Sequence, residues 1–170
     1  EICEYQSKTN QKDIVIPKSI KYLFKKFEVT NICEESFENS NIDSVRFDPD
    51  SKITTITANA FEFSDIKKIT LSPQISRIGI LAFFSCGNLK EIEIPPNSDL
   101  REIEGEAFLG TQIESLSIPS GLTTLCKSWN EQTLKLSKIT VMPGNLSYVD
   151  VDNHQLLLGK SYPEKKNFDT

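Results

Sequence analysis

Apolar positions recur with one spacing in four successive windows of this chain, and a fifth window starts in the same way. The four windows are residues 42–65, 66–88, 89–112 and 113–135, and the fifth begins at Leu136. Each one opens with an alternating apolar segment that ends at a proline. Self-similarity with a period of 23 or 24 residues indicates a solenoid, because one such unit cannot bury its apolar side chains without neighbours.

The opening segment of each window is predicted to be a strand with one buried face. Apolar residues separated by a single polar residue have the period of a strand. Proline then ends the strand, since it has no N–H for the ladder. The side chains expected inside are Val45/Phe47, Ile69/Leu71, Ile92/Ile94, Leu116/Ile118 and Ile139/Val141. Successive windows would place these strands in a parallel sheet on the concave face.

The rest of each window is predicted to return along the convex side. It carries two apolar residues three apart and a phenylalanine five positions further on. We therefore expect Phe61, Phe83 and Phe108 to stack in one column. A small residue precedes each ring, which favours short β, 3₁₀ or helical turns. The predicted fold is a mainly β solenoid of about five repeats, covering residues 42–143.

The amino-terminal end departs from the pattern. Residues 1–41 are predicted to be an irregular cap that contains part of a repeat, with a first strand near Ile14. Leu23 and Phe37 are 14 positions apart where other windows use five, so about nine residues are inserted.

At the other end, residues 144–160 are predicted to form a capping hairpin that turns at Asp152-Asn153-His154, and 161–170 to be a tail or linker. The chain is expected to be a single domain.

Charge and hydropathy exclude several partners. A net charge of -5, with basic and acidic residues interspersed, argues against nucleic acid, which requires a clustered basic face. No run of 18 apolar residues exists, so we expect no membrane insertion. The first 13 residues lack the apolar core of a signal peptide, so any targeting segment is expected to be removed or to lie elsewhere.

No constellation for catalysis or metal binding stands out. His154 is the single histidine and has no indicated dyad partner. Asp150, Asp152 and Asn153 resemble the start of a calcium loop, but its glycine and terminal glutamate are missing. The four cysteines form no CxxC pair. We therefore predict a protein that is not an enzyme and that needs no cofactor and no metal.

Three strings carry a resemblance to a known family: LKEIEIPP at 89–96, LREIEGEAFLGTQIESLSIPSGL at 100–122 and IGILAFFSCGNL at 78–89. They resemble the BspA-like class of leucine-rich repeats, whose pattern is LxxIxIPxxVxxIGxxAFxxCxxL. The likeness covers about residues 32–143. It implies a leucine-rich-repeat solenoid from a secreted or cell-surface protein of bacteria or mucosal protozoa, with adhesion to host matrix, host cells or other microbes as its role.

The sequence departs from that pattern at two columns. The glycine column is kept at Gly79 but holds Thr57, Glu104 and Cys126 in the other windows. The phenylalanine column fails at Asn130, with Trp129 beside it. Two alignments of the fourth window, one residue apart, therefore remain open.

Cysteines and one sequon give further predictions. The resemblance implies that Cys86 faces the core as a small apolar residue. Cys33 and Cys126 occupy equivalent columns about 19 Å apart at strand spacing, too far for a disulfide. A Cys3–Cys33 disulfide remains open for an extracellular protein. Asn145 begins the single glycosylation sequon.

The candidate binding residues are those that point outward from the predicted sheet. They are Arg46, Lys68, Thr70, Glu91, Glu93, Ser115, Ser117, Lys138 and Thr140. A solvated face with cross-strand pairs such as Lys68 beside Glu91 explains them without any ligand. The functional alternative is that this face binds a protein or glycoprotein.

The size of this face limits what it binds alone. Five strands at ~4.8 Å present about 400 Å², whereas a standard interface uses ~800 Å² per partner. Loops at the rim, self-association or a longer parent chain would supply the rest. Besides adhesion, an intracellular scaffold that holds a multiprotein assembly together remains open.

Overall fold

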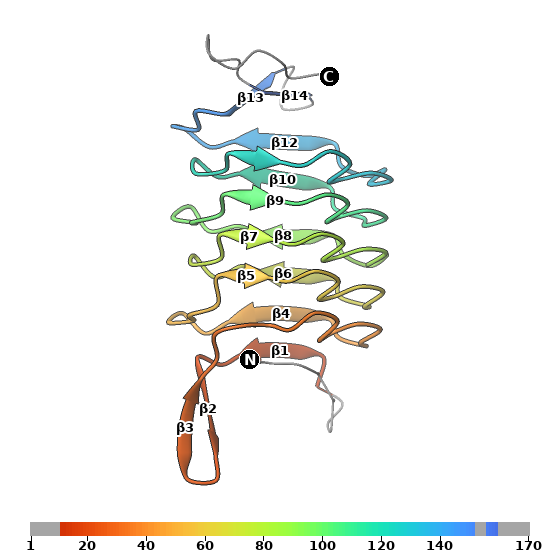
Figure 1. The fold of residues 1–170 in the computed structure, drawn as a ribbon. Coiled ribbons are helices and arrows are strands. Elements are labelled where there is room, and N and C mark those ends of the chain that lie inside the picture. The colour runs from red at the N-terminus through yellow and green to blue at the C-terminus, as the bar shows by residue number, and fades with distance from the viewer. Residues whose placement is uncertain (1–10, 152–155, 160–170) are drawn as a thin grey trace.

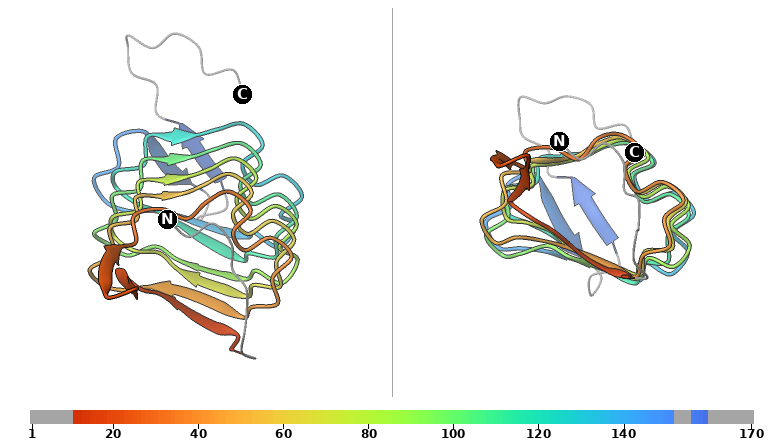
Figure 2. Two further views of the ribbon diagram at one scale, coloured as in Figure 1. Left: turned by 60° about the horizontal axis from the view of Figure 1, so that its bottom comes forward. Right: turned by 90° about the horizontal axis from the view of Figure 1, so that it is seen from below.

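The chain winds into a stack of coils in the computed structural model (Figure 1). The structure describes residues 11–151 and 156–159. No helix occurs among them, and the coils carry short strands joined by turns. Viewed along the axis, successive coils lie almost on top of one another (Figure 2). The prediction of a mainly β solenoid is confirmed.

The alternating segments form what we call the long-strand sheet. Its first part has the order β1-β4-β6-β8, and its second part is the pair β10-β12. All of these pairs are parallel. The strands are β1 (Asp13–Ile16), β4 (Ser44–Phe47), β6 (Lys68–Thr70), β8 (Glu91–Glu93), β10 (Ser115–Ile118) and β12 (Lys138–Val141). No ladder joins β8 to β10 within residues 11–151, so the expected continuous sheet is interrupted there.

A second parallel sheet lies on the other side of the core. It has the order β11-β9-β7-β5 and consists of strands of two residues each. These strands are β5 (Thr55–Ile56), β7 (Arg77–Ile78), β9 (Glu102–Ile103) and β11 (Thr124–Leu125). Side chains between the two sheets form one apolar cluster that runs through all the coils. The inward pairs expected from the sequence are all buried in this cluster or packed against it.

The phenylalanines form the expected column inside the turns. Neighbouring rings are nearly parallel, with centroids 4.8 Å apart for Phe37 and Phe61, 5.1 Å for Phe61 and Phe83, and 5.5 Å for Phe83 and Phe108. All four are at most 2% exposed. Offset stacking of aromatic rings adds to the free energy gained by removing them from water. Phe37 extends the column one coil beyond the first predicted window.

The turns around this column are not helical, although 3₁₀ or helical turns were among those expected. Each turn has residues with positive φ two positions before and two positions after the phenylalanine, as at Leu81 (φ 55) and Ser85 (φ 54) around Phe83. Left-handed residues interrupt the run of right-handed conformations that a helix needs. The N–H groups of alternate residues, at Leu81, Phe83 and Ser85, instead donate to carbonyls of the next coil, as from Phe83 to Ala107.

The same hydrogen bonds fix the register of the fourth window. The N–H of Phe108 donates to the carbonyl of Trp129 as that of Phe83 does to Ala107. Trp129 therefore occupies the small-residue position, and Asn130 the phenylalanine position. The indole ring of Trp129 is nevertheless the last ring of the column. It meets the Phe108 ring edge-on, with centroids 6.1 Å apart, and Trp129 is only 9% exposed.

The inserted residues near the amino terminus form an antiparallel hairpin of β2 (Ser19–Tyr22) and β3 (Lys25–Glu28). It projects from the end of the stack, beyond β1 (Figure 1). The chain then returns to the coil at Val29, which is buried, and its N–H donates to the carbonyl of Lys18. The insertion therefore leaves the underlying coil intact.

The carboxyl-terminal end is a second antiparallel pair, β13 (Tyr148–Val151) with β14 (Leu156–Gly159). Both strands lie within residues 144–160. The predicted turn at 152–154 and the predicted tail at 161–170 lie outside the described residues. Tyr148 ties the pair to the last coil, since its hydroxyl accepts from the N–H of Leu125 at 2.8 Å and donates to the carbonyl of Thr123 at 3.3 Å.

Candidate binding face on the long-strand sheet

Nine outward side chains of the long-strand sheet form what we call the polar ribbon. They are Arg46, Lys68, Thr70, Glu91, Glu93, Ser115, Ser117, Lys138 and Thr140. The strand pairing aligns them in rows, because Lys68 lies opposite Glu91, Thr70 opposite Glu93, and Ser117 opposite Thr140. Six of the nine residues are exposed, and Lys68, Thr70 and Thr140 are half-buried. The interruption between β8 and β10 divides the rows into two groups.

The centre of the ribbon is a paired cluster around Lys68. Its ammonium lies 2.7 Å from Oε1 of Glu93 and 3.1 Å from Oε2 of Glu91. The hydroxyl of Thr70 donates to Oε2 of Glu93 at 2.7 Å. The expected pairing of Lys68 with Glu91 is therefore present, and Glu93 joins it from the diagonal position.

These contacts shift the pKa values of both charged partners. The hydrogen bond to Glu93, followed by that to Glu91, raises the pKa of Lys68. The hydrogen bond from Lys68, supported by that from Thr70, lowers the pKa of Glu93. Both side chains remain substantially exposed, so solvent screens the pair and its contribution to stability is small.

Two cations of the ribbon are not paired in this way. Within residues 11–151, no carboxylate lies within ion-pair distance of Arg46 or Lys138, and both side chains are exposed. Near Lys138, strands β10 and β12 offer the hydroxyl groups of Ser115, Ser117 and Thr140. The ribbon thus combines a centre in which one lysine lies between two glutamates with unpaired positive charge and hydrogen-bonding groups towards its ends. Such a face suits a polar macromolecular surface better than an apolar one.

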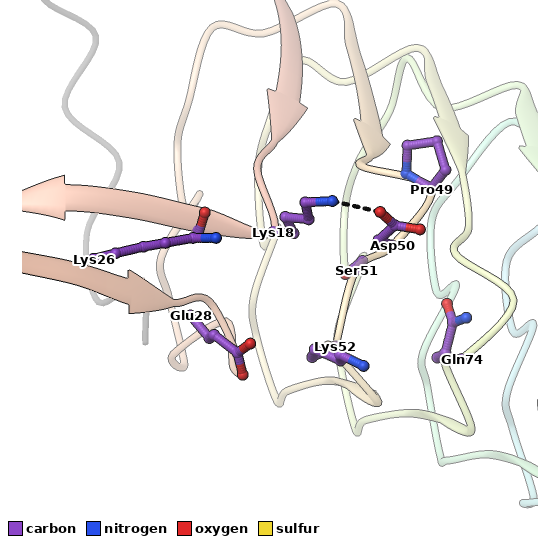
Figure 3. Close-up of a pocket in the computed structure, with 9 residues that line it drawn as sticks. Lys18, Lys26, Glu28, Pro49, Asp50, Ser51, Lys52 and Gln74 are labelled. Carbon is purple, nitrogen blue, oxygen red and sulfur yellow. Dashed lines mark hydrogen bonds and ion pairs between the residues drawn. The ribbon is translucent and has the colours of Figure 1, made fainter.

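A polar hollow lies where the β2-β3 hairpin meets the rim of the next coils (Figure 3). Its volume is about 450 Å³, and Lys18, Lys26 and Lys52 line it together with Glu28 and Asp50. Lys18 forms an ion pair with Asp50. The Lys18 ammonium also donates a hydrogen bond to the Asp50 carboxylate. This hydrogen bond raises the pKa of Lys18 and lowers that of Asp50. This hollow is not predictable from the repeat pattern, because it brings together residues of the insertion and of the turn after β4.

The cysteines lie in different environments. Cys86 is fully buried, as expected, and its thiol donates to the carbonyl of Phe61 at 2.9 Å. Burial raises the pKa of this thiol to about 11. Cys33 and Cys126 are half-buried. Cys3 lies outside the described residues, so a Cys3–Cys33 disulfide stays a prediction.

Asn145 is a structural residue in the folded chain. Its side chain is almost completely buried, and its Nδ2 donates to the carbonyls of Pro119 and Leu122 at 2.8 and 3.0 Å. Its Oδ1 accepts from the N–H groups of Ser147 and Tyr148, both at 2.8 Å. A glycan on Nδ2 would break at least one of these hydrogen bonds and would need space that the fold does not offer. The geometry therefore argues against glycosylation at this sequon.

The β2-β3 hairpin is the main exposed feature that sequence analysis left without a role. The insertion was recognised by its length, but its strand pairing was not predicted. The signal that was available is the alternation of lysines with large apolar residues in KSIKYLFKKF, at 18–27.

Comparisons with known proteins agree with the geometry. The model of the family described as the BspA type leucine rich repeat region matches residues 4–137, in six copies. No curated protein sequence matches the chain. The part of the chain that the structure describes contains no helix long and apolar enough to cross a membrane.

Several solved structures are similar in fold. The pneumococcal vaccine antigen PcpA shares 25% identity at a TM-score of 0.76, over 92% of this chain and 46% of that one. A leucine-rich repeat protein from Bacteroides ovatus shares 25% identity at a TM-score of 0.67, over 77% of this chain and 33% of its own. One from Eubacterium ventriosum, 21% identical with a TM-score of 0.55, shows the fold alone. The chain spans less than half the length of each of these proteins.

Proposed function

Because the chain belongs to the BspA-type leucine-rich repeat family, we propose that it is an adhesion module of a larger secreted or cell-surface protein and binds its ligand through the polar ribbon. Leucine-rich repeat domains in general mediate protein interactions and are not enzymes. The ligand is a protein or glycoprotein of host matrix, of host cells or of other microbes.

The observation that carries this proposal is the polar ribbon itself. Its strands are held by a continuous buried core, so the outward side chains are presented on a rigid scaffold. Rigid presentation lowers the entropy lost on binding. The free cations Arg46 and Lys138 supply charge for complementary carboxylates or sulfates on a ligand. Similarity to the pneumococcal vaccine antigen PcpA supports a location at the cell surface.

The ribbon is small compared with a standard interface, so neighbouring surface must contribute. Coils of a longer parent chain would continue the same sheet and enlarge the face, and the chain's coverage of less than half of its structural relatives fits such a parent. Self-association of two chains would enlarge it as well.

A binding assay with matched variants tests the ribbon. Immobilised matrix proteins and intact epithelial cells are probed with the native chain, with Arg46→Ala/Lys138→Ala and with Lys127→Ala/Lys135→Ala. Both variants remove two exposed lysine or arginine charges, but Lys127 and Lys135 lie in turns and not on the strands of the ribbon. We expect the ribbon variant to bind about tenfold or more weakly and the control to bind like the native chain. An equal loss of affinity in the ribbon variant and in the control would reject the ribbon as the binding face.

Location distinguishes adhesion from an intracellular scaffold. Antibodies against the chain are applied to source cells before and after permeabilisation. Adhesion predicts labelling of intact cells, and labelling only after permeabilisation would favour the scaffold.

A further inference from the structure

The β2-β3 hairpin exposes large apolar side chains that no part of the described chain covers. Leu23 is 72% exposed and Phe24 is fully exposed at its tip, and Tyr22 beside them is 65% exposed. The hairpin extends past β1 at the end of the stack, so its tip is the foremost point there (Figure 1). The tip can therefore reach a flat surface without interference from the coils.

The turn residues at this tip are not those that hairpin folding selects. Ser19 pairs with Glu28 and Tyr22 with Lys25, which leaves Leu23 and Phe24 as a two-residue loop. Both have positive φ, 45° and 66°, as in a type I′ turn. Asparagine and glycine are strongly favoured at these positions, and large side chains are strained there. No packing within the described chain accounts for leucine and phenylalanine at these positions.

The hairpin also carries concentrated positive charge. Lys21 and Lys26 face each other across the strands on one face, and Lys25 lies directly beside the tip. Ile20 and Phe27 pair on the opposite face and are about half exposed. The chain as a whole has a net charge of -5. Three lysines next to an apolar tip therefore form a local positive site on an acidic protein.

We propose that the hairpin binds the surface of a bilayer that contains anionic phospholipids, with Leu23 and Phe24 inserted below the headgroups. Lys21, Lys25 and Lys26 would contact the lipid phosphates, because lysine side chains extend towards the headgroup layer while their stems stay apolar. Tyr22 suits the interface itself, where aromatic rings with a polar group accumulate.

A membrane surface fits this hairpin better than a protein pocket does. Lysine is depleted in protein–protein interfaces, where arginine is the usual cation, and every cation of the hairpin is lysine. The exposed apolar groups sit at a projecting point, which is suited to shallow insertion. The sequence prediction of no membrane insertion was based on the lack of a spanning segment, and a hairpin tip needs no such segment. This inference does not depend on the polar ribbon.

Vesicle flotation with matched variants tests the proposal. The native chain is mixed with vesicles of phosphatidylcholine alone or with added phosphatidylserine. We expect binding to the anionic vesicles that weakens at higher salt. Leu23→Asn/Phe24→Gly should reduce that binding about tenfold or more, while its melting temperature stays equal or rises, because Asn-Gly favours the turn. Lys21→Gln/Lys26→Gln should remove the preference for anionic vesicles.

Leu134→Ser is the control for an exposed apolar residue, since Leu134 is 90% exposed in a turn elsewhere, and it should bind like the native chain. The proposal is wrong if the native chain stays unbound, or if the folded tip variant binds as well as the native chain. Hairpin-dependent binding to cells that is lost after protease treatment of those cells, without any vesicle binding, would show a protein partner instead.

Discussion

At Gly79 neighbouring coils approach each other so closely that a side chain does not fit. A Cβ there would lie 2.8 Å from the backbone nitrogen of Ala58 and 2.8 Å from the carbonyl carbon of Thr57. Neither atom moves without shifting the coil. We expect Gly79→Ala to lower the free energy of unfolding by about 1–3 kcal/mol, measured by urea denaturation. Gly87→Ala, where a Cβ meets nothing within 4 Å, should leave stability nearly unchanged. Equal effects in the two variants would contradict the close approach.

Cys86 makes the free energy of unfolding depend on pH in the alkaline range. Burial raises the pKa of its thiol from 9.0 to about 11. Below pH 9 the thiol is protonated in both states and its contribution is fully present. Between pH 9 and 11 the unfolded thiol ionises while the folded one does not, so stability falls by about 2–3 kcal/mol. Across this range the unfolding free energy of the native chain should fall relative to that of Cys86→Ala, so that the difference between the two changes by about 2–3 kcal/mol. Parallel curves would show that Cys86 is not the responsible group.

At the scale of elements, the phenylalanine column links each turn to the next. Phe83 stacks on both Phe61 and Phe108, so Phe83→Ala removes two ring contacts and leaves a cavity. We expect a loss of about 3–5 kcal/mol in unfolding free energy. Phe63→Ala is the control, because Phe63 is 48% exposed and makes one edge contact with Phe84. Chemical denaturation that found Phe83→Ala no more destabilised than Phe63→Ala would be inconsistent with a shared column.

Asn145 joins the last coil to β13 through four hydrogen bonds. Asn145→Ala leaves buried backbone carbonyl and amide groups without these partners, which we expect to lower unfolding free energy by about 2–3 kcal/mol. Exposed Asn97 supplies the control Asn97→Ala, which should change little. Thermal melting of both variants measures the difference. An unchanged melting temperature of Asn145→Ala would mean that water replaces these hydrogen bonds.

The strands and the phenylalanine column could be predicted from sequence because both follow from a repeated apolar spacing. The positive φ values around Phe83 could not, since the residues there, Leu81 and Ser85, are not the glycines or asparagines that mark left-handed conformation. The ladder break between β8 and β10 also has no signal in the apolar pattern, which continues through it.

The candidate site was predictable to a similar degree. Alternation determines which side chains of a strand point outward, so the members of the polar ribbon and the pairing of Lys68 with Glu91 followed from the windows. The diagonal contact from Lys68 to Glu93 did not, because it depends on side-chain conformation. The hollow lined by Lys18 and Asp50 depends on where an insertion folds back, which repeat spacing does not determine.

At the scale of the whole molecule, one core supports two separate surfaces. The polar ribbon lies along the side of the stack, and the β2-β3 hairpin projects from its end (Figures 1 and 2). A module attached to a bilayer by its end would present the ribbon sideways, accessible to a second partner. The two surfaces can therefore be tested by separate variants.

Site-specific photo-cross-linking tests the binding face most directly. A photoreactive amino acid replaces Ser117 on the ribbon or Thr124 on the second sheet, both exposed, and each chain is irradiated on the matrix protein or cell surface that the native chain binds. We predict cross-links from position 117 and none from position 124. Cross-links from position 124 alone would contradict binding through the polar ribbon.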